Sequence, residues 1–302
     1  MNRFGVVLLM SLLSITGIGH AQGDSTRTLL WKISGNGLDK PSFLFGTIHM
    51  LCKDDAVLSN NLKEAIRNAD EVYFEVDLDN MFEMLGVVSK MKMRGDTTLR
   101  DLLSEDEYGR VKSFFESHST MLPFSMLETY KPILAASLLE QNNMACDATA
   151  MMEQVIMEEA RRHNKNIKGL ETMGYQAGVL DKIPYKLQAE QLLRYVDDAG
   201  KKESDDAELS QMMQAYRDQD LDKLEKMITQ SDPAISNYTD VLLNDRNKNW
   251  VEKLKGILPG RSLLIAVGAG HLPGKEGVIS LLRKAGYKVT PVKNNMGKSV
   301  EL

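Results

Sequence analysis

The sequence predicts an α/β fold of the α+β type, with a mixed central sheet built from N- and C-terminal strands and a largely helical middle. Short segments rich in apolar and β-branched residues lie near both ends of the chain, which is typical of buried strands. Between about residues 81 and 254, apolar residues recur mostly at helical spacing. One sheet assembled from both ends, with helices packed over it or inserted as a cap, is the simplest architecture that joins these segments.

The N-terminal strands are expected to begin with a hairpin. Residues 28–33 and 42–48 are strand-like, and a Gly-Asn-Gly turn at residues 35–37 separates them. Residues 71–78 predict a further strand, in which apolar side chains alternate with a polar face that includes Glu75.

The same periodicities assign the rest of the chain. Pro132 is expected to start or kink a helix, because proline lacks the N–H that a helix interior needs. The remaining predicted elements are a helix at 58–69, a strand at 166–170, a helical stretch at 173–254, and a closing strand, turn, helix and strand at 262–267, 268–273, 274–285 and 287–292.

The first residues have the composition of a signal peptide. Arg3 supplies a positive charge, residues 4–18 are apolar, and Gly19-His20-Ala21 resembles a cleavage site. We therefore expect a leader at 1–21 and a single mature domain at 22–302, periplasmic or secreted. The alternative is an uncleaved N-terminal anchor. No later segment is apolar for long enough to predict a membrane span, so no stable anchor is expected after cleavage.

Composition narrows the choice of partners. Hydrophobic residues make up 43% of the chain and charged residues 26%, which is typical of a globular protein with a packed core. The net charge is -5 and no basic patch stands out, so nucleic acid is not expected as a partner. The composition predicts no particular oligomeric state.

Export also changes the interpretation of the two cysteines, Cys52 and Cys146. An oxidising compartment favours a disulfide between them, which would close a long loop and stabilise the fold by roughly 4–5 kcal/mol. Such a bond would also pin the loop around His49, three residues before Cys52. The alternative is two free, buried thiols.

Two similar turns contain the candidate functional residues. In each, an apolar strand runs into a glycine, Gly46 or Gly268, and a histidine follows three residues later, His49 or His271. Glycine allows strained angles or close approach of the backbone, and ligand sites gather where buried strands end. The paired turns therefore predict one shared site, although two structural histidines of the core are the alternative.

A carboxylate would complete this site. Two histidines and one carboxylate bind a divalent metal and leave a position open for water. Glu75 is the first candidate because it lies near the end of the next apolar strand, and Asp77 on the same face is the second. The alternative is that both carboxylates line an exposed face of the sheet.

At these residues the chain resembles the TraB/GumN family, which includes the bacterial pheromone-shutdown proteins and the animal Tiki proteases. That family has two Gly-x-x-His motifs and a glutamate after the first, which match Gly46–His49, Gly268–His271 and Glu75. Further similarity lies at 130–132, 169–172 with Gln176, 245–247 before Trp250, and 286–289. The leader makes the exported GumN-like branch the best match.

The resemblance implies a Tiki-like, erythromycin-esterase-like fold and peptidase chemistry that uses a divalent metal, with manganese or cobalt favoured and zinc also compatible. The expected substrate is an exported or extracellular peptide or protein. His49 and His271 would bind the metal, and Glu75 would complete the ligand set or act as the base on a water molecule.

Two further residues are candidates for the same site. Arg246 is expected to stabilise developing negative charge, or else to form a surface salt bridge. Glu171 lies at a strand end and joins the site or caps the following helix. The alternative functions are a metal- or haem-binding module, with the histidines as iron ligands, and a non-catalytic protein associated with polysaccharide export.

Overall fold

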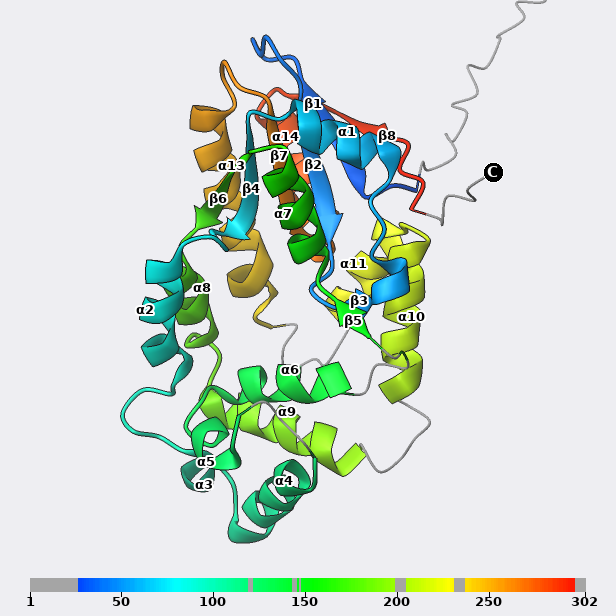
Figure 1. Ribbon diagram of the computed structural model, residues 1–302. Coiled ribbons are helices and arrows are strands. Elements are labelled where there is room, and N and C mark those ends of the chain that lie inside the picture. Colours follow the sequence, from blue (N-terminus) through cyan, green and yellow to red (C-terminus); the bar gives the residue numbers. More distant parts are fainter. Residues whose placement is uncertain are drawn as a thin grey trace, which may run out of the picture.

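A six-stranded mixed sheet forms the centre of the computed structural model (Figure 1), which describes residues 27–118, 122–142, 146, 148–198, 205–230 and 237–296. The predicted signal peptide at 1–21 lies outside these residues. In spatial order the strands are β6 (Asn166–Glu171), β4 (Glu71–Val76), β7 (Leu263–Gly268), β2 (Ser42–Thr47), β1 (Leu30–Ser34) and β8 (Lys288–Val292). Strands from both ends of the chain share the sheet, which confirms the predicted fold class.

The strand directions place the C-terminal strand β7 in the middle of the sheet. β7 runs parallel to β2 on one side and to β4 on the other, and β4 runs parallel to β6. β1 is antiparallel to both β2 and β8, so the predicted N-terminal hairpin is present. The four parallel strands therefore end at one common edge of the sheet.

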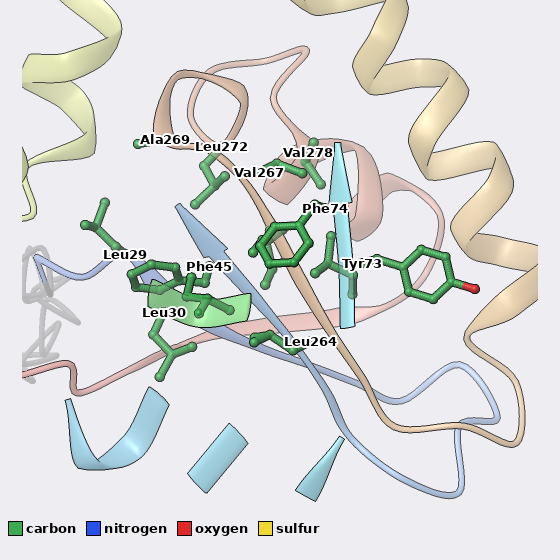
Figure 2. Packing of buried hydrophobic residues seen from close by; sticks show 14 of the residues in the cluster. Leu29, Leu30, Phe45, Tyr73, Phe74, Leu264, Val267, Ala269, Leu272 and Val278 are labelled. Atoms are coloured by element: carbon green, nitrogen blue, oxygen red, sulfur yellow. The ribbon is translucent and has the colours of Figure 1, made fainter. Parts of the chain in front are cut away.

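Side chains on both faces of the sheet are buried. Tyr73 and Phe74 point to opposite faces of β4, and both are buried, as expected for a parallel strand covered on two sides. Figure 2 shows Phe45 and Phe74 in the same core as Val267 and Val278, from the other end of the chain. In Figure 1, α1 (Asn60–Asn68) and α7 (Met152–Arg162) lie in front of the sheet.

The helical middle contains a second buried cluster. It is formed by α3 (Leu99–Leu102), α4 (Glu105–Ser117), α5 (Phe124–Leu127), α6 (Pro132–Asn142) and α9 (Tyr185–Asp198). Pro132 is the first residue of α6, as predicted. Figure 1 shows these helices beyond the carboxyl ends of the parallel strands, with α2 (Met81–Met91) and α8 (Met173–Leu180) between them and the sheet.

The predicted helical stretch at 173–254 is divided into several helices, and the predicted closing helix begins later than expected. Gly274 has a φ of 83°, which a right-handed helix does not allow, so the helix starts at Val278 instead of residue 274. The remaining elements are β3 (Leu51–Cys52), β5 (Thr149–Ala150), α10 (Asp205–Arg217), α11 (Leu221–Gln230), a π-helical turn (Asp240–Asn244), α13 (Asp245–Ile257), 3-10 turns (Lys53–Asp55 and Ala269–His271) and α14 (Val278–Lys284).

The predicted disulfide between Cys52 and Cys146 is present, with Cα atoms 5.9 Å apart, so the alternative of two free thiols is wrong. The bond lies beside the small sheet in which β3 pairs with β5. It thereby ties the segment after His49 to the segment that leads into α7. No helix in the described part of the chain has both the length and the apolar character that crossing a bilayer requires.

Candidate metal and catalytic site

Four polar side chains gather at the edge where the parallel strands end. Glu171 closes β6, Glu75 lies near the end of β4, His271 follows β7 and His49 follows β2. This order repeats the order of the strands in the sheet. Neighbouring parallel strands deliver their carboxyl ends to one side, which is where α/β folds place ligands.

The two motif glycines allow these strand ends to pack closely. A Cβ atom on Gly46 would lie 3.1 Å from Cα of Ala269, in the turn that carries His271. A Cβ atom on Gly268 would lie 3.2 Å from Oε1 of Glu75, and the N–H of Gly268 donates to that oxygen at 2.9 Å. Because neither motif glycine has a side chain, Ala269 can approach Gly46 closely and Glu75 can approach Gly268 closely.

Glu75 is buried, with 8% of its surface exposed, so the alternative of an exposed sheet face is wrong for this residue. Its Oε2 accepts hydrogen bonds from Gln176 at 2.9 Å and Arg246 at 2.6 Å. Burial opposes ionisation, but His271, which is charged at the acid pH where Glu75 titrates, and Arg246 outweigh it and lower the pKa of Glu75 to about 2. Asp77 instead accepts from the N–H of Asp79 in the following turn.

Arg246 lies at the centre of the cluster and is 7% exposed, so it is not a surface salt-bridge partner. Its guanidinium donates to Glu75 and, at 2.6 Å, to Oε1 of Glu171. Its Nη1 lies 3.2 Å from Nε2 of His271. Trp250 donates to the other oxygen of Glu171 at 2.9 Å, so Glu171 holds the arginine in place and does not cap a helix.

His271 is presented to the site in one orientation. Its Nδ1 lies 2.6 Å from Oδ1 of Asn247, an oxygen that only accepts, so Nδ1 carries the proton and Nε2 keeps its lone pair. Nε2 lies 3.7 Å from Oε1 of Glu75. Burial lowers the pKa of His271 to about 4, against the attraction of Glu75, so the ring is neutral at neutral pH.

His49 is held in a similar way, by a residue that the sequence analysis did not identify. Its Nδ1 lies 2.9 Å from Oε1 of Glu153 on α7, and Thr47 donates to the same oxygen at 2.6 Å. The hydrogen bond to Glu153 raises the pKa of His49 to about 9. The His49 side chain is 68% exposed, whereas that of Glu153 is 8% exposed.

A signal for Glu153 was present in the sequence. Glu153, Ile156 and Ala160 have the spacing of one helix face, and all three are buried. A carboxylate on an otherwise apolar helix face is costly unless it has a partner. The partner here is His49, which lies 104 positions earlier in the chain, so helical periodicity alone does not reveal it.

The chemistry of these groups fits a divalent cation. The carboxylates of Glu75 and Glu171 are buried against the single guanidinium of Arg246, which leaves excess negative charge there, and the carboxylate of Glu153 is buried against His49. Oε2 of Glu153 is buried without a hydrogen-bond partner in the described part of the chain. Oε1 of Glu75 retains a lone pair beside Nε2 of His271.

The cluster is nevertheless not a preformed cage. Among the described residues, no three His, Cys, Asp or Glu side chains are arranged closely enough to count as a metal-binding group. The structure pairs Glu75 with His271 directly, whereas His49 lies close enough for its charge to act on both.

Comparison with known proteins gives a family match and several distant relatives. The model of the TraB/PrgY/gumN family matches residues 29–291. Metalloprotease TIKI1 of Homo sapiens is 23% identical over 321 residues, which cover 89% of this chain and 62% of the relative. Metalloprotease TIKI2 of Danio rerio is also 23% identical, with coverage of 87% and 60%.

A bacterial relative matches over more of its own length. The uncharacterized protein YbaP of Escherichia coli (strain K12) is 25% identical, and the match covers 80% of this chain and 87% of YbaP. By contrast, this chain spans only about three-fifths of the length of the Tiki relatives named above. No solved structure matches the chain significantly.

Proposed function

Because the chain belongs to the TraB/PrgY/gumN family, we propose that it is a metal-dependent hydrolase, and specifically a peptidase that acts on exported or extracellular peptides. His49, Glu75 and His271 would hold the metal. The proposal includes export through the leader at 1–21 and one domain at 22–302. The Tiki relatives are metalloproteases by name, which supports the peptidase class, and the chemistry of the cluster supports the metal.

One observation carries the proposal. Each motif histidine has an oxygen acceptor at Nδ1, Glu153 for His49 and Asn247 for His271. In metal sites such acceptors fix the ring and leave Nε2 as the ligand atom. Two histidines prepared in this way, together with the buried carboxylate of Glu75, would supply a two-His, one-carboxylate donor set. The donor types suit manganese, cobalt or zinc.

The neighbouring residues have separate roles. When bound, the ion supplies Lewis-acid polarisation of a peptide carbonyl and activation of water. Glu75 would either donate Oε1 as a ligand or accept a proton there, since Oε1 accepts a hydrogen bond from the N–H of Gly268, whereas Oε2 already accepts from both Gln176 and Arg246. Arg246, fixed by Glu171, would supply a permanent positive charge that stabilises the negative charge developing on the carbonyl oxygen.

Single alanine substitutions test the ligand set. His49→Ala, Glu75→Ala and His271→Ala should each lose manganese binding in calorimetry and lose the thermal shift that manganese gives the wild type. His118→Ala is the matched control, because that histidine is exposed and its hydrogen bonds within the described residues go to the end of its own helix. Wild-type manganese binding in all three variants would contradict the metal site.

Cleavage of unstructured peptides tests the reaction. Activity should stop with a chelator and return when manganese is added. A Soret band on the purified protein, without chelator-sensitive cleavage, would instead favour the haem-binding alternative.

A further inference from the structure

Helix α2 presents an apolar face that nothing in the described structure covers. Phe82 is 88% exposed, Met81 70% and Leu85 69%, and Met84 and Val88 are also exposed. No residue of α2 is buried. Helices of globular proteins normally turn their apolar side chains inward, and a contiguous exposed patch of this kind marks an interaction site.

The helix that carries this face is connected to the candidate site through α8. α2 begins shortly after β4, the strand that carries Glu75. It packs against α8, where Glu83 accepts the N–H of Met173 at 2.8 Å. The same helix α8 carries Gln176, which donates to Glu75. Figure 1 shows α2 and α8 side by side beyond the ends of β4 and β6.

The size and composition of the face indicate its occupant. A stable dimer buries about 800 Å² on each partner, which is more than one face of an eleven-residue helix provides. Met81 and Met84 give the face flexible, polarisable side chains, which adapt to partners of different sequence. A weak and adaptable contact beside a hydrolytic site suits a substrate that must bind and then leave.

We propose that the exposed face of α2, formed by Met81, Phe82, Met84, Leu85 and Val88, docks an apolar segment of the polypeptide substrate. The substrate class is therefore unfolded or extended polypeptide with hydrophobic side chains outside the cleaved bond. This inference rests on the proposed peptidase function, and it assigns α2 to substrate recognition and not to the reaction.

A double variant, Phe82→Ser with Leu85→Ser, tests the surface. Both side chains are exposed, so the fold should be kept, which far-UV circular dichroism checks. Two labelled unstructured peptides serve as probes, one with a Leu-Phe-Leu segment and one with serines in its place. Binding is measured by fluorescence anisotropy in the presence of a chelator, so that it does not depend on the reaction.

The wild type should bind the apolar peptide at least tenfold more tightly than the serine peptide, and the double variant should lose this preference. Met126→Ser, on an exposed residue of α5, should keep it. Equal binding of the apolar peptide by wild type and double variant would overturn the proposal. If the double variant loses the preference but the wild type cleaves no peptide, the result would support the docking surface and contradict the peptidase function.

A membrane or a second copy of the chain on this face of α2 would each give a different experimental result. Co-sedimentation with vesicles of phosphatidylcholine and phosphatidylglycerol, abolished by the double variant and without peptide binding, would assign the face to a membrane. Dimerisation in sedimentation velocity that the double variant abolishes, again without peptide binding, would assign it to a second copy. Either outcome overturns the proposal.

Discussion

Glu153 is the residue whose role in the site follows most directly from its contacts. It accepts from both Thr47 and His49 through one oxygen, while its other oxygen is buried without a partner in the described structure. A carboxylate behind a histidine fixes the ring and strengthens it as a ligand. In the proposed metal site, Glu153 would therefore be a positioning residue that acts through His49.

Replacing Glu153 with glutamine tests this role. Glu153→Gln keeps the size of the side chain but removes its charge, so manganese affinity measured by calorimetry should fall about 10–100-fold. Glu158→Gln, on the exposed side of the same helix, should bind manganese like the wild type. A Glu153→Gln protein that folds normally and keeps wild-type affinity would exclude the positioning role.

The motif glycines can be tested in the same manner. Gly46→Ala places a Cβ atom 3.1 Å from the backbone of Ala269, where neither strand end can move freely. The variant should lose about 1–3 kcal/mol of unfolding free energy in urea denaturation. Gly109→Ala in α4, where nothing lies within 4 Å, should instead gain up to about 1 kcal/mol. Equal effects of the two substitutions would show that steric crowding is not the reason for Gly46.

Among the elements, β3 and β5 connect the two chain segments that carry His49 and its hydrogen-bond partner Glu153. Cys52 of β3 lies three residues after His49, and Cys146 lies shortly before β5, after which α7 begins and carries Glu153. The N–H of Lys53 also donates to the carbonyl of Ala148 at 2.9 Å. The disulfide therefore joins the two segments whose side chains form the His49–Glu153 hydrogen bond.

Removing the disulfide should lower both the stability of the fold and the affinity of the proposed site for manganese. We expect the double variant Cys52→Ser with Cys146→Ser to lose about 2–5 kcal/mol of unfolding free energy, because the unfolded chain is no longer constrained. Manganese affinity should fall as well, since His49 and Glu153 are held together less firmly. A reducing agent should reproduce both effects in the wild type and change nothing in the double variant; a response of the double variant to the reductant would contradict this explanation.

Sequence periodicity correctly predicted the elements that depend on their own residues alone. The β1–β2 hairpin, β7 and the start of α6 at Pro132 follow from local patterns. The late start of α14 does not, because it depends on the positive φ that Gly274 adopts in the folded turn. The pairing of Glu153 with His49 and the burial of Arg246 also depend on contacts between distant segments, which periodicity does not record.

At the scale of the whole molecule, the residues of the candidate site are brought together only when strands from both ends of the chain join one sheet. β7 inserts between β2 and β4, so Gly268 reaches Thr47 on one side and the N–H of Gly268 reaches Glu75 on the other. The paired motifs in the sequence predicted that these two strand ends lie together, and β2 and β7 are indeed neighbours; that their histidines form one metal site stays a prediction. The separate cluster of α3, α4, α5, α6 and α9 was not predicted, since an apolar helix stripe does not show which helix covers it.

A buried ion pair in the helical middle shows how that region is held to α8. Lys131, fully buried, lies 2.8 Å from Asp181 and donates to the carbonyl of Ala177 on α8. Arg94 and Tyr185 also contact the Asp181 carboxylate, at 2.8 and 2.6 Å. Burial alone would raise the pKa of Asp181, but the hydrogen bonds from Lys131 and Tyr185 and the nearby positive charges lower it.

This lowered pKa gives a stability effect with a defined sign. Asp181 binds protons less readily in the folded than in the unfolded protein, so its contribution is present above the unfolded pKa of about 3.9 and is lost as the pH falls through the folded pKa. Asp181→Asn leaves Lys131 buried without its counter-charge, which costs about 3–5 kcal/mol at neutral pH. The difference between variant and wild type should shrink below about pH 4.

The same variant tests whether residues 22–302 unfold as one domain. Both tryptophans, Trp31 and Trp250, belong to the sheet part of the molecule, whereas Asp181 lies in the helical part. If the two parts unfold together, Asp181→Asn should lower the midpoint of the tryptophan fluorescence transition as much as that of the far-UV circular dichroism transition. If only the midpoint of the dichroism transition shifts, the protein consists of two units that unfold independently. In that case the Lys131–Asp181 pair would stabilise only the helical middle, and the site at the sheet edge would stay folded when that pair is broken.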